Sequence, residues 1–169
     1  KKSKKMTIEF SKGEAKKING KSVKGPELLR MLNKIGGKYG IGREIFASDT
    51  IIGIKGRFLF ESPGISILQS AHRALEESIF TDKQNFVKPI VGKKWVELVY
   101  RGFYFDPLTK NLENFLEDIQ LPVNGKVTIL LSPGKAEPVA VEAKKILISK
   151  EAIYAQSASW GVEESAGFI

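Results

Sequence analysis

The sequence predicts an α+β domain in which a mainly antiparallel sheet packs against helices. Alternating or β-prone stretches occur near both ends of the chain, at residues 7–10, 127–131 and 139–141, and turn sequences rich in Asn, Pro and Gly adjoin them. Between these stretches, apolar residues recur at helical spacing. Because 169 residues suit one domain with a sizeable core, we expect residues 1–169 to form a single domain.

The first segments are expected to form two short strands and a helix. Residues 7–10 are β-prone, and Asn19-Gly20 is a strong turn signal. Pro26 then opens a helix, and Gly36-Gly37 is expected to end it. The apolar stripe of this helix consists of Leu28, Leu29, Leu32 and Ile35.

Residues 36–64 have the composition of a binding site. They hold seven glycines and four Lys or Arg residues. Glycine contributes no packing area, so this density suggests positive φ angles or close backbone approach. From Thr50 onward the alternation predicts a strand, and residues 62–64 then start a helix. One face of the strand would carry Ile52, Ile54, Phe58 and Phe60, and the other Lys55, Arg57 and Glu61.

The second half is expected to hold further helices and a hairpin. Helical spacing continues to about residue 80, and His72, beside that apolar stripe, is interpreted as a structural or surface residue. Residues 81–94 contain Pro and Gly and are expected to form a loop, whereas residues 95–104 suit either a strand or the end of a helix. The remaining expected elements are a helix capped by Asp106-Pro107, a hairpin with strands at 127–131 and 139–141, and a helical piece at 151–155.

Composition excludes several classes of protein. With 42% apolar and 27% charged residues the chain is expected to be globular, and no apolar run reaches the ~20 residues of a membrane span. The absence of cysteine excludes disulfides and thiolate metal sites and is compatible with the cytoplasm. One histidine argues against a structural zinc site.

The positive charge is concentrated in the first third of the chain. The formal net charge is +8, and residues 1–60 hold 15 Lys or Arg against 5 Asp or Glu, compared with 12 against 14 in the remainder. Nucleic acid or anionic metabolites are the partners that such a segment suggests. The alternative is a solvated basic surface preceded by a lysine-rich leader. Because the chain starts at Lys1 without Met, we expect a fragment of a longer protein.

Three catalytic or cofactor motifs can be tested on the sequence. IGGKYGIG matches the glycine spacing of the dinucleotide-binding turn of short-chain dehydrogenases, but that turn needs a strand before it and a helix after it, and the order here is reversed. No Tyr has a Lys four residues later, which removes the matching catalytic pair. No phosphate-loop motif and no recognisable nucleophile motif occur.

A resemblance to a known family goes further. The blocks GKYGIGR, DTIIGIKGR, FESPG and ILQSAHRALE, followed by LVYRGFYFDPL, VNGKVTILLSPG and AGFI, resemble the C-terminal synthetase domain of argininosuccinate synthase. The resemblance implies an ATP-dependent ligase that adenylylates the ureido oxygen of citrulline and then lets the amine of aspartate displace AMP. It also implies a homotetramer, a cytoplasmic location, and ATP with Mg bound mainly by an N-terminal domain that this chain lacks. The fragment is therefore expected to be inactive alone. We expect no membrane partner, and a nucleic-acid partner is disfavoured.

Two positions depart from the common pattern of that family. The residue matching Ser48 is commonly a glutamate and the residue matching Phe60 a tyrosine, and the resemblance implies that both contact citrulline. A carboxylate facing a blocked amine would be buried without a partner, which is costly. Ser48 and Phe60 therefore fit a less polar substrate. The stretches SDTIIG, KGR and FE also resemble a divergent branch of the family that takes N-acylated citrulline. We expect N-acetyl- or N-succinylcitrulline as the substrate.

The remaining candidate residues surround these two. Lys55 and Arg57 would supply cationic contacts or hold the glycine-rich segment in place, and Asp49 with Thr50 could hydrogen-bond the ureido or acyl group. Alternatively, Lys55 and Arg57 pair with nearby acids, and Phe60 is a core residue. Gly40, Gly42 and Arg43 are expected to brace the loop, with substrate binding as the alternative for Arg43. No residue is assigned a catalytic or metal-binding role. The rival functions are a non-catalytic domain for oligomerisation that lines the substrate site, and a basic nucleic-acid-binding module.

Overall fold

The computed structural model describes residues 2–49, 53–147 and 167. Its centre is a five-stranded antiparallel sheet with the strand order β3-β2-β1-β6-β7. The strands are β1 (Lys4–Ser11), β2 (Glu14–Ile18), β3 (Lys21–Ser22), β6 (Gly125–Ser132) and β7 (Lys135–Ala143). The expected α+β class and mainly antiparallel sheet are confirmed.

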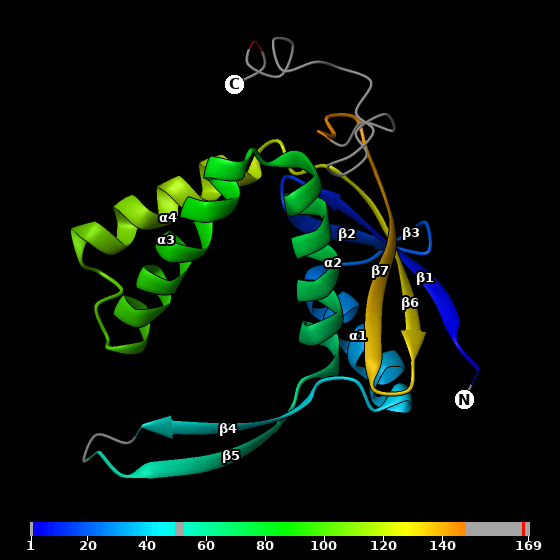
Figure 1. The fold of residues 1–169 in the computed structure, drawn as a ribbon, viewed down its shortest axis with the longest axis horizontal. Coiled ribbons are helices and arrows are strands. Elements are labelled where there is room, and N and C mark those ends of the chain that lie inside the picture. Colours follow the sequence, from blue (N-terminus) through cyan, green and yellow to red (C-terminus); the bar gives the residue numbers. More distant parts are fainter. Residues whose placement is uncertain (1, 50–52, 148–166, 168–169) are drawn as a thin grey trace.

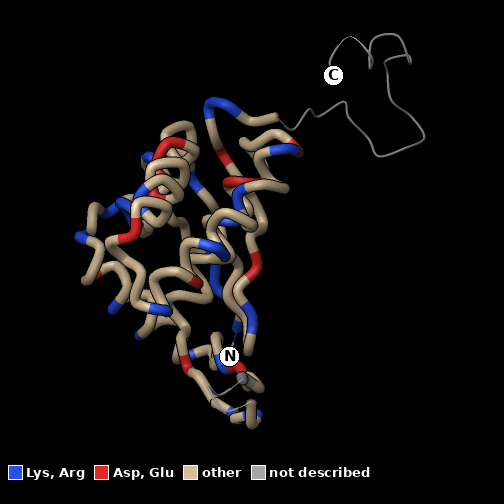
Figure 2. The backbone as a smooth tube through the Cα atoms, turned by 90° about the vertical axis from the view of Figure 1, so that its left-hand side faces the viewer, with Lys and Arg blue, Asp and Glu red and all other residues tan. Residues whose placement is uncertain are grey.

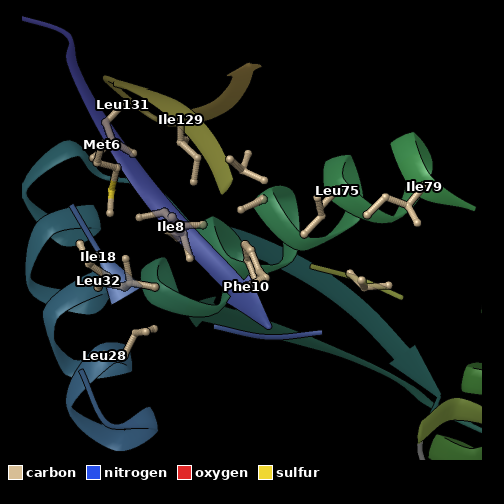
Figure 3. Close-up of a cluster of buried hydrophobic side chains, with 14 of the residues drawn as sticks. Met6, Ile8, Phe10, Ile18, Leu28, Leu32, Leu75, Ile79, Ile129 and Leu131 are labelled. Carbon is tan, nitrogen blue, oxygen red and sulfur yellow. The ribbon is translucent and has the colours of Figure 1, made fainter. Parts of the chain in front are cut away.

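Two helices cover one face of this sheet, α1 (Gly25–Tyr39) and α2 (Pro63–Ile79). Alternate residues of β1 and β6 are buried, and they join the apolar stripes of both helices in one core. Figure 3 shows the side chains of β1 turned toward those of α1 and α2. The members labelled there are Met6, Ile8, Phe10, Ile18, Leu28, Leu32, Leu75, Ile79, Ile129 and Leu131.

Two arms extend from the body. The first is a hairpin of β4 (Arg43–Asp49) and β5 (Lys55–Glu61), and the second is the helix pair α3 (Asp82–Tyr100) and α4 (Pro107–Gln120). In Figure 1 both arms point to the same side of the molecule, the hairpin from the start of α2 and the helix pair from its end. Within the described part of the chain, no helix combines the length and apolar character that crossing a membrane requires.

Three expectations about secondary structure were wrong. The first helix continues through Gly36-Gly37 to Tyr39, because Gly40, with φ 68°, supplies the left-handed cap instead. Residues 81–94, expected to form a loop, begin α3 and contain Pro89 within the helix. Of the strand expected from Thr50, residues 50–52 lie outside the described residues and Gly53 and Ile54 are not in a strand, so β5 starts at Lys55. The preceding strand β4 had not been expected at all.

The other expectations fare better. The turn at Asn19-Gly20 and the helix start at residues 62–64 are confirmed, and residues 95–104, left open between strand and helix, are helical up to Tyr100. Asp106 caps α4 by accepting a hydrogen bond from the backbone N–H of Leu108 at 2.8 Å. The helical piece expected at residues 151–155 lies outside the described residues.

Candidate functional site

The hairpin arm emerges from a junction at which glycines allow three segments to approach closely. Gly42, directly before β4, has φ 75°, and a Cβ there would lie 2.7 Å from the carbonyl carbon of Ser62. A Cβ on Gly36 of α1 would lie 2.8 Å from a side-chain carbon of Pro63. Both distances are shorter than real Cβ contacts, so larger residues would force the segments apart.

Polar contacts connect the same junction. The Ser62 N–H donates to the Gly42 carbonyl at 2.9 Å, and the Arg43 guanidinium pairs with the Glu61 carboxylate at 2.7 Å, joining the first residue of β4 to the last of β5. Both side chains of this pair are exposed, so its energetic contribution is small, about 1 kcal/mol or less. This geometry suits the bracing role expected for Gly40, Gly42 and Arg43, which remains a proposal.

The strand register divides the hairpin into two faces. Phe46 pairs with Phe58, Ser48 with Gly56 and Glu44 with Phe60. Because side chains alternate along a strand, these six positions share one face, which we call the aromatic face. The side chain of Ser48 lies outside the described part of the structure, so Ser48 is placed by register alone, at a position on the same face as Phe60. The members of the aromatic face are Glu44, Phe46, Ser48, Gly56, Phe58 and Phe60.

The other expected contact residues lie on the opposite face of the hairpin. Asp49 pairs with Lys55, and Arg57 with Ala47, so both cations are on the side away from Ser48 and Phe60. We call this the charged face; it consists of Arg43, Ile45, Ala47, Asp49, Lys55, Arg57, Leu59 and Glu61. Thr50 lies outside the described residues. A single ligand on one face of this two-stranded ribbon would not touch both sets.

Three rings form a contiguous apolar surface on the aromatic face. The ring centroids of Phe46 and Phe60 are 5.7 Å apart in an edge-to-face arrangement, and those of Phe58 and Phe60 are 6.4 Å apart. About half of each side chain is exposed. A Cβ on Gly56 would lie 2.9 Å from the Phe58 ring, which therefore covers the backbone of the residue paired with Ser48.

Sequence reasoning missed Phe46 and Gly56 as parts of this surface, and it treated Phe58 simply as an apolar strand residue. The missing information was β4: without it, Phe46 had no partner strand, and Gly56 was one more glycine in a glycine-rich stretch. The alternation of residues 44–48 was the available signal, although Ile45 and Ala47 make the opposite face equally apolar in sequence.

A second group of polar side chains joins the helix arm to the body. The Glu76 carboxylate on α2 is buried and accepts hydrogen bonds from Lys88 of α3 and Gln120 of α4, at 2.9 and 2.5 Å. His72 contacts the Gln120 side-chain oxygen through Nε2 at 3.0 Å. Burial lowers the pKa of His72 below its ordinary range, the charge of Lys88 acts in the same direction, and the charge of Glu76 and the hydrogen bond with Gln120 oppose it.

The contacts of His72 are those of a structural residue. They join α2 to Gln120 of α4 and to Phe10 of β1, and no nucleophile on the described residues is among them. A groove of about 1080 Å³ lies nearby between β2, α1 and α2, and His72 is at its edge. Its lining is mostly apolar, with Phe10, Leu28 and Leu68 among its residues, and we assign it no ligand.

The part of the chain that the structure describes holds no candidate metal cluster. Among residues 2–49, 53–147 and 167, no group of three or more acidic or histidine side chains could hold a metal ion. The sequence also carries no phosphate-loop motif.

Comparisons with known proteins agree on one family. Residues 1–169 match the family model described as Arginosuccinate synthase C-terminal domain. Argininosuccinate synthases from Xylella fastidiosa, Xanthomonas axonopodis pv. citri and Methanocaldococcus jannaschii are 48%, 49% and 37% identical, each over 97% of this chain. The chain spans only 41%, 40% and 42% of the length of these relatives. By the match over its whole length, the chain belongs to the family of argininosuccinate synthase C-terminal domains.

Proposed function

We propose that this chain is the C-terminal synthetase domain of an ATP-dependent carbon–nitrogen ligase of arginine biosynthesis. The enzyme joins a citrulline-type substrate to aspartate and releases AMP and pyrophosphate. The family membership supports this proposal, as do relatives more than twice as long that are named argininosuccinate synthase. A nucleotide-binding domain preceding the chain, a homotetrameric assembly and a cytoplasmic location are parts of the same proposal.

The hairpin arm lines the substrate site in this proposal. The observation that carries it is the strand register, which puts positions 48 and 60 on one face of the ribbon. The resemblance implies that the family counterparts of both residues contact citrulline. The two residues are four positions apart along the ribbon, or about 13 Å at the rise of a β-strand. A substrate that contacts both must therefore lie along the strands, over the rings of Phe46 and Phe58.

The chemistry of this face favours a substrate with a blocked amine. Glu44 is the one charged residue among the described members of the aromatic face, and it lies beside Phe60 at the end opposite Ser48. A free α-ammonium group next to Ser48 would lack a carboxylate there, whereas an amide nitrogen needs only a hydrogen-bond acceptor. The proposed substrate is accordingly an N-acylcitrulline, with the acetyl and succinyl forms as candidates.

Lys55, Arg57 and Asp49 have a different role in this arrangement. Lys55 and Arg57 lie on the charged face, so contact with a ligand on the aromatic face is not available to them. Asp49, whose side chain is not described, is placed by register at a position of the same charged face. Of the two roles expected for Lys55 and Arg57, the geometry favours holding the hairpin in place over direct contact with the substrate.

Turnover by the complete enzyme tests the proposal. Citrulline, N-acetylcitrulline and N-succinylcitrulline are offered separately with ATP and aspartate, and pyrophosphate release is measured. We expect the highest kcat/KM with an acylated substrate. A preference for free citrulline would retain the ligase and reject the acylated substrate, and no turnover with any of the three would reject both.

A paired substitution tests the two diagnostic positions directly. Ser48→Glu combined with Phe60→Tyr restores the common family pattern, so preference should shift toward free citrulline, by about 10-fold or more if one charged contact is regained. The ratio of the two kcat/KM values is the measurement. An unchanged ratio would show that these residues do not select the substrate.

Oligomerisation is a second candidate role, and the helix arm favours it. α3 has no buried residue, and Phe86, Tyr100 and Phe105 are 71%, 91% and 94% exposed. Apolar surface of this kind commonly marks an interface. In the complete enzyme, Phe86→Asp should shift sedimentation toward smaller species, whereas Arg73→Ala on the exposed side of α2 should not.

The nucleic-acid alternative has less support. Figure 2 shows Lys and Arg on many separate parts of the chain, with Asp and Glu between them. Lys16 and Lys17 of β2 are paired with Glu14 and Glu9. Such a role would require binding that weakens steeply with salt.

A further inference from the structure

Phe58 occupies a particular place on the aromatic face. Its ring covers Gly56, which is the residue paired with Ser48, and its centroid is 6.4 Å from that of Phe60. Along the ribbon, the Phe58 ring thus lies between positions 48 and 60, the two positions that are expected to contact the substrate. Only a residue without a side chain at position 56 leaves the space for it, since a Cβ there would lie 2.9 Å from the ring.

We propose that Phe58, supported by Phe46 and Phe60, is a specificity residue that binds the acyl cap of the substrate, and that this cap is neutral and short, as acetyl is. This inference rests on the proposed function and names the acyl group that the proposal leaves open. The Phe60 ring is paired with both of the other rings, and each of the three residues is about half exposed, so they offer apolar surface to a ligand without further rearrangement.

Charge on the aromatic face decides between the two candidate caps. A succinyl cap ends in a second carboxylate, which is costly to bury without a cation or several hydrogen-bond donors. Among the described members of this face, none is a cation, and Glu44 would repel an anion. Lys55 and Arg57 lie on the opposite face of the ribbon. An acetyl group presents a methyl to the rings and requires no counter-charge.

The position of Leu59 provides a matched control. It is adjacent to Phe58 in β5, large and apolar, and 71% exposed, but it lies on the charged face. Truncation of Leu59 therefore removes a similar amount of exposed apolar side chain from the same strand without altering the aromatic face. An effect that depends on contact with the acyl cap should appear for Phe58 and not for Leu59.

The test is a kinetic comparison on the complete enzyme. kcat/KM is measured for N-acetylcitrulline, N-succinylcitrulline and citrulline with wild type, Phe58→Ala, Phe58→Leu, Gly56→Ala and Leu59→Ala. Wild type should prefer the acetyl substrate over the succinyl substrate. Phe58→Ala should lower kcat/KM for N-acetylcitrulline by about 10-fold and for citrulline by about 2-fold or less, as expected for a lost apolar contact to one substituent. Phe58→Leu should recover part of the loss, and Gly56→Ala, which displaces the ring, should resemble Phe58→Ala.

The results that would contradict this inference can be told apart from those that would contradict the proposed function. Equal losses for acylated and free citrulline in Phe58→Ala, or the same loss in Leu59→Ala, would overturn the role of Phe58 while the proposed ligase stands. A wild-type preference for N-succinylcitrulline would overturn the neutral cap alone. If wild type prefers free citrulline, the proposed substrate and this inference fall together. Should Phe58→Ala not fold, the kinetics of Phe58→Leu and Gly56→Ala decide in the same way.

Discussion

Replacing Gly42 by alanine should destabilise the junction from which the hairpin arm emerges. Gly42 has φ 75°, a conformation that costs an L-residue about 1–2 kcal/mol. The added Cβ would also lie 2.7 Å from the carbonyl carbon of Ser62 and 2.8 Å from the nitrogen of Pro63. Both are backbone atoms, so no side-chain rotation relieves the clash, and such overpacking costs about 1–3 kcal/mol more.

Gly20→Ala is the matched control for this change. Gly20 has φ 77°, and a Cβ added there would meet no atom within 4 Å, so it bears the conformational cost without the clash. In denaturant unfolding, Gly20→Ala should therefore cost about 1–2 kcal/mol and Gly42→Ala roughly 1–3 kcal/mol beyond that. Amide hydrogen exchange should become faster at Ser62, whose N–H donates to Gly42. Equal losses of stability in the two variants would refute the close approach of the segments at Gly42.

The polar contacts between α2 and the helix arm give two further predictions. Burial lowers the pKa of His72 below its ordinary value of 6.5, so the unfolded chain binds a proton at this residue more readily than the folded chain does. The contribution of His72 to stability is therefore complete above about pH 6.5 and is lost as the pH falls through its folded pKa. Unfolding free energies measured from pH 8 to 5 should therefore fall less steeply for His72→Asn than for wild type, and parallel curves would contradict the assignment. Lys88→Met should cost about 2–3 kcal/mol in denaturant unfolding, because the buried Glu76 carboxylate loses its cation. Adding Glu76→Gln should recover much of that loss, and no recovery would show that Lys88 acts through packing instead.

Most of the body could be predicted from the sequence because local and tertiary preferences agree there. In β6, Val127, Ile129 and Leu131 alternate with more exposed residues, and the same three are buried against the helices. The Pro26 and Asp106-Pro107 signals occur at the starts of α1 and α4. Where one face of an element is buried in the core, its periodicity is a sufficient guide.

The arms were predicted poorly because that agreement is missing. α3 has no buried residue among its nineteen, so no apolar stripe marks it, and Pro89 argues against a helix at a nominal cost of about 3 kcal/mol. The signal that was available is local: Thr81 and Gln84 form a capping box at its start. The contact of Lys88 with Glu76 joins residues twelve positions apart and cannot be deduced from periodicity.

The faces of the hairpin depend on its register, which links the junction to the aromatic face. A slip of one residue between β4 and β5 would exchange the two faces, placing Lys55 or Arg57 where Gly56 and Phe58 now lie. At the junction, the Gly42–Ser62 hydrogen bond and the Arg43–Glu61 pair fix which residues start the ladder. Ser48 pairs with Gly56 only because that start is fixed. Under the proposed function, in which the aromatic face binds the substrate, Gly42→Ala should therefore change the ratio of kcat/KM for N-acetylcitrulline and citrulline in the complete enzyme as well as the free energy of unfolding, and an unchanged ratio would contradict this link between junction and face.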